Sequence, residues 1–263
     1  MSGIETVGLT TTAGLATITL RRAGASNALD REVKERLSAA VEAVAADRTV
    51  RALFLEAEGR NFCVGQDLTE HAAGLASDPA RAMDTVGAHY NPLLTALAAV
   101  RVPVVVAING ACVGAGLGIA LAGDIRIAGE SARFATAFTG IGLAGDSGLS
   151  HTLVEMLGPS RATGLLMLGD QFSAAQALDW GLVHRVVPDA DLAEAARALA
   201  AEFAAGPTAA HVHVKRLVSA SFAGLTEALE RERQAQEDLG RSADHRAAVD
   251  AFLAKRAPVF EGR

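Results

Sequence analysis

The sequence has few aromatic residues and almost no cysteine, and both shortages exclude classes of protein. Aromatic residues make up 4% of the 263 residues, whereas hydrophobic residues make up 50%. The core is therefore expected to be aliphatic and rich in alanine. The two cysteines, Cys63 and Cys112, stand in apolar surroundings and lack the spacing of metal ligands. This argues against a disulfide-bonded scaffold and a metal site, and it indicates buried thiols in a reducing compartment.

Basic charge is also in short supply. The formal net charge is −6 at pH 7, which argues against nucleic acid as a partner. The first residues show neither a basic segment nor an apolar run of the kind that directs secretion, so we expect a cytoplasmic protein.

One long stretch carries no charge at all. Val102 to Gly123 is uncharged and long enough to span a bilayer. Pro103, Asn109 and five glycines favour a buried strand, a loop and a helix instead. We therefore expect no membrane partner.

The loop in this stretch is rich in glycine. It follows the apolar, β-branched run Val104–Ile108 and precedes a short apolar helix at Leu117–Leu121. Glycines at this junction allow a ligand to touch backbone amides, which suits an anion or a developing oxyanion. Close packing of the helix explains them equally well. A dinucleotide fingerprint fails, because Ile119 stands where the third glycine is required.

Strands and helices alternate as far as about residue 188, after which the pattern is helical. Predicted strands include Thr6–Thr12, Leu15–Leu20, Val50–Ala57, Asp124–Ala128 and Leu182–Val187, and predicted helices follow Asp30, span Ser77–Val100 and begin at a Ser173–Gln176 capping box. This pattern predicts an α/β core over 1–200 and a helical region over 201–263.

Asp146 is the acidic residue with the most suggestive surroundings. On local sequence it is a candidate N-cap for the apolar helix that starts near Leu149. It also lies in an apolar stretch with Phe134, Phe138 and Leu143. Burial among such side chains raises the pKa of a carboxyl, as a general base near neutral pH requires. The two roles are compatible.

Five segments together resemble the enoyl-CoA hydratase/isomerase (crotonase) superfamily over nearly the whole chain. They are Arg22–Leu29, Phe62–Asp67, Asn109–Gly116, Ser173–Pro188 and the ending Phe252–Phe260. The resemblance implies a crotonase-like ββα spiral core, with C-terminal helices that assemble homotrimers or dimers of trimers. It also implies an acyl-CoA substrate, with coenzyme A as the thioester part and no permanently bound cofactor.

The resemblance assigns roles by position. Val64 and Ala115 match the residues whose backbone amides hold the thioester oxygen. The residues expected to contact coenzyme A are Ala25, Gln66, Asp67, Leu68 and Lys255. Hydratases of the family use two glutamates, but this chain has Gly118 and Phe138 at those places.

Two groups within this superfamily carry a catalytic aspartate at the position that matches Asp146. They are the ring-epoxide isomerases of phenylacetate breakdown and the 4-chlorobenzoyl-CoA dehalogenases. The run Phe138–Gly148 resembles the isomerases most. We therefore expect an acyl-CoA isomerase with Asp146 as the proton-transfer residue. A hydratase with an atypical water site, a dehalogenase and an acyl-CoA-binding protein without chemistry remain alternatives.

Overall fold

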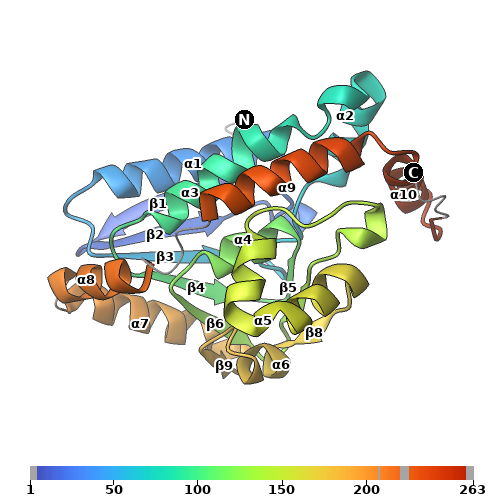
Figure 1. The fold of residues 1–263 in the computed structure, drawn as a ribbon. Coiled ribbons are helices and arrows are strands. Elements are labelled where there is room, and N and C mark those ends of the chain that lie inside the picture. The colour runs from blue at the N-terminus through green and yellow to red at the C-terminus, as the bar shows by residue number, and fades with distance from the viewer. Residues whose placement is uncertain (1–4, 207, 220–224, 259–263) are drawn as a thin grey trace.

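The computed structural model describes residues 5–206, 208–219 and 225–258, and two sheets form its centre (Figure 1). The larger sheet has the order β1-β2-β3-β4-β6-β9 and the smaller one the order β5-β7-β8. The first two strands pair antiparallel, and the remaining neighbours in the large sheet pair parallel. The strands are β1 (Val7–Thr12), β2 (Leu15–Leu20), β3 (Ala52–Ala57), β4 (Val104–Ile108), β5 (Ala111–Val113), β6 (Ile125–Gly129), β7 (Arg133–Ala135), β8 (Phe172–Ser173) and β9 (Arg185–Val187).

Alternate side chains of the central strands enter two separate cores. On one face Phe54 and Val105 pack with buried residues of α7. On the other face Leu53, Leu55 and Val106 join the main core under α1, α3 and α4. Because both faces are covered, the strands read as continuous apolar runs. The helices are α1 (Arg31–Ala46), α2 (Leu68–Ser77), α3 (Asn91–Ala98), α4 (Ala115–Leu121), α5 (Leu149–Leu168), α6 (Ala174–Asp179), α7 (Leu192–Ala205), α8 (Thr208–Ser219), α9 (Leu225–Gly240) and α10 (Ala243–Leu253).

The predicted hairpin, the helix after Asp30 and the Ser173–Gln176 capping box are confirmed. The Asp30 carboxylate accepts a hydrogen bond from the amide of Val33, so it caps α1 as expected. The capping box forms with both of its hydrogen bonds. The boundary between 1–200 and 201–263 stays a prediction, and residue 200 lies within α7.

The helix predicted over Ser77–Val100 is wrong in its extent. α2 ends at Ser77, short 3-10 and π turns follow, and α3 begins at Asn91. The sequence analysis also predicts no helix at Leu68–Ser77, where the structure has α2. Asp67 starts α2, because its carboxylate accepts hydrogen bonds from the amides of Thr69 and Glu70.

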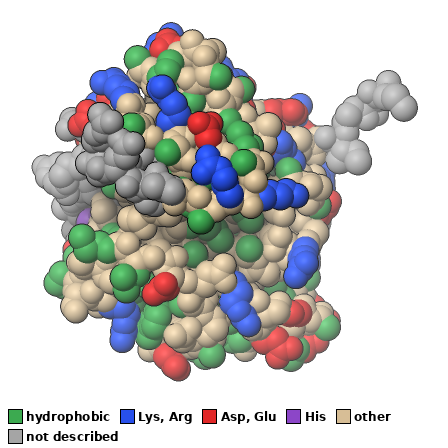
Figure 2. Space-filling model, turned by 90° about the vertical axis from the view of Figure 1, so that its right-hand side faces the viewer, with side chains coloured by type: hydrophobic (Ala, Val, Ile, Leu, Met, Phe, Trp, Pro, Cys, Tyr) green, Lys and Arg blue, Asp and Glu red, His purple; other side chains and the backbone are tan. Residues whose placement is uncertain are grey.

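Figure 2 shows the end of the molecule at which α2 and α10 lie in Figure 1. On this face lysine and arginine side chains are spread around a central area of hydrophobic and uncharged groups. In the part of the chain that the structure describes, no helix is long and apolar enough to cross a membrane.

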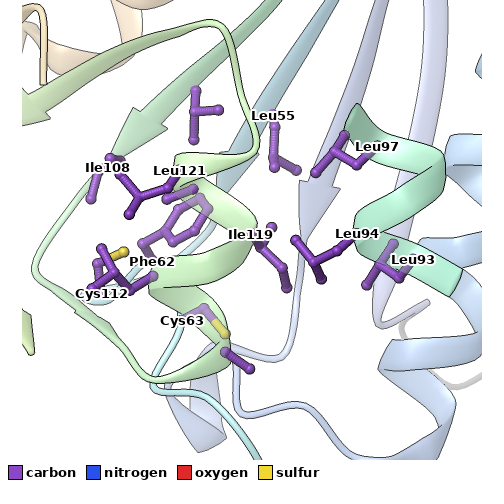
Figure 3. Packing of buried hydrophobic residues seen from close by; sticks show 14 of the residues in the cluster. Leu55, Phe62, Cys63, Leu93, Leu94, Leu97, Ile108, Cys112, Ile119 and Leu121 are labelled. Atoms are coloured by element: carbon purple, nitrogen blue, oxygen red, sulfur yellow. The ribbon is translucent and has the colours of Figure 1, made fainter. Parts of the chain in front are cut away.

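Phe62 packs near Ile108 of β4 and Leu121 of α4 (Figure 3). Its side chain is fully buried. We expect Phe62→Ala to lower the free energy of unfolding by about 3–5 kcal/mol, because the residual cavity adds to the lost transfer energy. Urea denaturation measures this difference. Leu9→Ala, at a side chain 38% exposed on β1, is the control and should change the free energy by less than about 1 kcal/mol. An equal effect of both changes would contradict this view of the core.

Candidate functional site

Two loops far apart in the sequence are joined by backbone hydrogen bonds. The Phe62 amide donates to the Asn109 carbonyl at 2.7 Å, and the Cys63 amide donates to the Ala111 carbonyl at 3.1 Å. In return the Val113 amide donates to the Cys63 carbonyl at 2.9 Å. This pairing places Val64 beside the turn that starts α4.

The amides of Val64 and Ala115 remain available at this junction. Neither donates a hydrogen bond to another backbone group within the described residues. Ala115 is the first residue of α4, whose leading amides have no partner inside the helix. The loops approach closely, since a Cβ on Gly65 would lie 3.4 Å from the Ala115 nitrogen. Two unpartnered N–H groups beside a helix N-terminus suit an oxyanion.

The segment that contains Ala25 packs on the first loop. The Leu29 amide donates to the Gly65 carbonyl at 2.8 Å, and the Asp67 amide donates to the Leu29 carbonyl at 3.2 Å. Ala25 ends a short 3-10 turn in this segment. The structure thus brings together the Ala25 segment and the three adjacent expected contacts, Gln66, Asp67 and Leu68.

The carboxylate of Asp67 is engaged inside the protein. One oxygen caps α2, and the other lies 2.7 Å from Nη1 of Arg22. Burial opposes its ionisation, but these hydrogen bonds and the Arg22 charge outweigh burial and lower the pKa of Asp67. Asp67 therefore joins the segment that contains Arg22 and Ala25 to the start of α2, so a contact with coenzyme A would be made by its backbone.

Asp146 is buried, with 2% of its surface exposed. Its carboxylate accepts a hydrogen bond from the Ser147 hydroxyl at 2.9 Å and one from Nε2 of Gln236 at 3.1 Å. Gln236 also donates to the Ala144 carbonyl at 2.7 Å, so α9 fixes the loop at Asp146 and at the residue two positions before it. The interpretation of Asp146 as the helix N-cap is wrong, because α5 begins at Leu149 with Gly148 in the N-cap position.

The two positions where the resemblance expects hydratase glutamates, 118 and 138, carry no acid, and residue 118 has no room for a side chain. A Cβ on Gly118 would lie 2.5 Å from the carbonyl oxygen of Ser147 and 2.6 Å from its Cβ. The residue beside Asp146 thus occupies the space that a side chain at 118 would need. Phe138 is buried, and its ring lies near the second loop, with Cζ 3.8 Å from the position of a Cβ on Gly114.

Two buried histidines link the first loop to the C-terminal helix. Nδ1 of His71 lies 3.3 Å from Nε2 of Gln66, and Nε2 of His71 is hydrogen-bonded to Nε2 of His245. Nδ1 of His245 lies 2.7 Å from the carbonyl oxygen of Ile141. Since a carbonyl only accepts, His245 carries its proton on Nδ1 and His71 carries its proton on Nε2. Both rings are then neutral, and His71 accepts from the Gln66 amide.

The remaining candidates lie elsewhere. Lys255 follows α10 at an exposed position, and among the described residues its side chain forms no ion pair or hydrogen bond that would fix it. Val259 and Phe260, at the end of the C-terminal motif, lie outside the described residues.

A separate cavity of about 770 Å³ is lined by His151, Ser147 and Gly148 and is bounded by α3, α5 and α8. No group of three or more His, Cys, Asp and Glu side chains in the described chain is placed to hold a metal ion.

Comparison with known proteins supplies the decisive observation. The family model for enoyl-CoA hydratase/isomerase matches residues 10–263. The chain belongs to the enoyl-CoA hydratase/isomerase family. The crotonase-type α/β fold with C-terminal helices, predicted from the five motifs, is thereby confirmed.

Relatives within this family carry names of both activities. The chain is 41% identical to 1,2-epoxyphenylacetyl-CoA isomerase of Escherichia coli over 251 residues, which is 95% of this chain and 96% of that one. It is 42% identical over 253 residues to a Rhodobacter capsulatus protein assigned as an enoyl-CoA hydratase, covering 95% of each chain. A solved structure from Mycobacterium abscessus, assigned to enoyl-CoA hydratase/isomerase, is 56% identical with a TM-score of 0.81 and covers 98% of this chain and 100% of that one. As a member of this family the protein acts on acyl-CoA thioesters, as a hydratase or an isomerase.

The histidine pair makes stability depend on pH. Burial, then the neighbouring His245 and Lys34, lower the pKa of His71 from 6.5 to about 4, whereas Glu70 acts in the opposite direction. Burial also lowers the pKa of His245, which its bond to Ile141 partly offsets. The unfolded chain therefore binds protons between pH 6.5 and about 4 that the folded chain does not, so stability is full above this window and falls as the pH falls through it.

We expect the free energy of unfolding to decrease from pH 7 to pH 4.5, and His71→Gln to show a shallower decrease. His213→Gln, at an exposed histidine, is the matched control and should keep the slope of the wild type. Urea denaturation at a series of pH values measures the slopes. A slope unchanged by His71→Gln would contradict a neutral buried pair.

Proposed function

We propose that this protein is an acyl-CoA isomerase in which Asp146 transfers a proton. The observation that carries the proposal is the combination of two backbone amides without a partner in the described part of the chain, at Val64 and Ala115, with the buried carboxylate of Asp146. A hydrogen-bonded carboxylate that is held in one orientation suits positioned proton transfer. Two amides at a helix start suit the negative oxygen of an enolate.

The proposed reaction moves one proton between two carbons of the acyl group. Asp146 removes a proton from C2 of a 3-enoyl thioester, and the electron pair of the C–H bond moves onto the thioester oxygen. The Val64 and Ala115 amides hold this oxygen while the dienolate exists. Asp146 then returns the proton to C4, which leaves the double bond between C2 and C3. An aspartate can serve both steps because it exchanges one proton and is regenerated.

The proposed coenzyme A contacts are Ala25, Gln66, Asp67, Leu68 and Lys255. Ala25 and the run Gln66–Leu68 suit this role because backbone hydrogen bonds hold their two segments together, close to the amide of Val64.

We further propose a homotrimer or a dimer of trimers built by the region 201–263. Exposed apolar side chains at the end of α5 and of α10 favour association, namely Met167, Leu168, Phe252 and Leu253. Light scattering of the purified protein tests the assembly.

Hydration is the alternative with the most support, because the Rhodobacter capsulatus relative is assigned as a hydratase. The geometry at Gly118 argues against it. Any side chain there meets the backbone of Ser147, so the chain has no room for a glutamate of the hydratase kind at this position. A hydratase would need another group to activate water.

The proposal predicts that isomerisation of a 3-enoyl thioester depends on Asp146. The wild type should convert 3-hexenoyl-CoA to the conjugated ester, seen as a rise in thioester absorbance. Asp146→Asn should lower the rate by roughly 10²- to 10⁴-fold, since positioned proton transfer contributes that much. Asp191→Asn is the matched control, because Asp191 is exposed and its side chain does not cap α7.

Other outcomes would assign other functions. If Asp146→Asn keeps the wild-type rate, the proton-transfer role is excluded. Equal loss of crotonyl-CoA absorbance with both proteins would indicate hydration by other residues. If neither ester reacts but both bind in a titration, the protein acts as an acyl-CoA-binding protein toward these substrates.

A further inference from the structure

The cavity of about 770 Å³ between α3, α5 and α8 is distinct from the proposed thioester site, because neither Val64, Ala115 nor Asp146 lines it. Its walls are mostly apolar. Their aliphatic side chains include Leu94, Leu121, Met156, Val214 and Leu225. Sites for small molecules are typically cavities of roughly 300–1,000 Å³ with apolar walls and a few placed polar groups. This cavity therefore has the size and the lining of a ligand site.

Arg126 places a buried guanidinium in the wall of this cavity. It lies on β6, and its residue surface is 5% exposed. Nε donates to the carbonyl of Leu182, and Nη1 donates to the carbonyls of Leu121 and Gly123, so the group is held in one orientation. Nη2 has no hydrogen-bond partner among the described residues, and it is not one of the fully enclosed polar atoms. Its two N–H groups are therefore accessible donors in the wall of the cavity.

The charge of Arg126 is not balanced within the wall. Asp124 is the acid that lines the cavity in the described part of the chain, and it pairs with Lys215, with 2.7 Å between Oδ2 and Nζ. The same oxygen accepts from the Val104 amide at 2.8 Å. Burial lowers the pKa of Arg126 to about 10, against the opposing effect of Asp124, so the guanidinium is charged at neutral pH. The wall thus carries one positive charge in excess, and an anion in the cavity would offset the cost of burying it.

The cavity opens to solvent beside α8. Val214 and Val218 line it, and their residue surfaces are 59% and 57% exposed. Arg126, in contrast, is buried. A ligand whose charged end reaches Arg126 therefore keeps its apolar part between the aliphatic side chains of α3, α5 and α8. This arrangement suits a molecule with one anionic end and a flexible hydrocarbon chain.

We propose that this cavity binds a free medium-chain aliphatic carboxylic acid, with the carboxylate on Nη2 of Arg126 and the chain along the aliphatic walls. A guanidinium and a carboxylate form strong, charge-assisted hydrogen bonds, which an apolar environment strengthens further. The binding site is additional to the thioester site and does not depend on the proposed isomerase reaction. Gly118 and Ser147 also line the cavity, so the ligand lies next to the loop that carries Asp146.

The test compares two ligands of equal chain length, octanoate and 1-octanol, by isothermal titration of the full chain at neutral pH. Octanoate is ionised there and 1-octanol is not. The wild type should bind octanoate roughly tenfold more tightly than 1-octanol, since a hydrogen bond to a charged group contributes that much. Arg126→Gln should abolish this preference. The proposal is overturned if the wild type shows no preference, or if the preference survives in Arg126→Gln.

A second variant fills the cavity and leaves Arg126 in place, because Arg126 also holds three carbonyls on which folding can depend. Ala98→Trp, at a position of α3 that lines the cavity, should abolish octanoate binding. Ala45→Trp, at an exposed position of α1, is the matched control and should bind octanoate as the wild type does. Circular dichroism checks that each variant is folded. Octanoate binding that persists in folded Ala98→Trp would place the ligand elsewhere and contradict the proposal.

A competition experiment separates this cavity from the thioester site. Octanoate should still bind when the octanoate titration is repeated in excess hexanoyl-CoA. Displacement of octanoate by hexanoyl-CoA would show that both occupy the thioester site, and it would overturn the proposal. Failure of the isomerase proposal would appear separately, as a wild-type rate in Asp146→Asn.

Discussion

The parallel pairing of residues 62–63 with 109–113 is the constraint on which the rest of the site depends. Three backbone hydrogen bonds hold these loops together, and among the described residues the amides of Val64 and Ala115 have no backbone partner. Close approach is possible because residue 116 is glycine, where any Cβ would collide with the Cys63 carbonyl. Since backbone atoms make this arrangement, the side chains of Val64 and Ala115 are not required for it. Under the proposed function, the side chains near these amides, Asp146 among them, then determine which reaction the site catalyses.

Those groups are completed by the last helices of the chain. Gln236 on α9 holds the Asp146 loop, and His245 on α10 reaches both the first loop, through His71, and the carbonyl of Ile141. The Asp146 loop and the first loop of the site therefore both depend on contacts with helices of the region 201–263, which the sequence pattern separates from the α/β core. Folding of α9 and α10 onto the core and assembly of the site are coupled, because each buried polar group here needs its distant partner.

Local signals in the sequence predicted local structure well. Asp30, the Ser173–Gln176 box and the alternation of β1 and β2 specify their elements through neighbours only a few residues away. The helix α2 was missed because Asp67 reads equally well as a loop residue, and the π-helical turn was missed because Pro92 lies inside an otherwise helical pattern. Gln236 lies 90 positions from Asp146 and His245 lies 174 positions from His71, and no periodicity encodes such contacts. A lone polar residue on an apolar helix face, such as Gln236, is the one signal that was available.

Glycine at 118, where the resemblance to hydratases expects a glutamate, does more than leave out one side chain. With glycine at 118, the backbone of Ser147 moves into the space that a side chain would fill, and Asp146 is the residue immediately before it. Under the proposed function, glycine at 118 thus omits the glutamate expected in a hydratase and leaves room for the loop that carries Asp146. Restoring a glutamate at 118 alone would not recreate a hydratase, because the Asp146 loop would have to leave. If the proposed roles hold, a glutamate at 118 and the present position of the Asp146 loop exclude each other by packing.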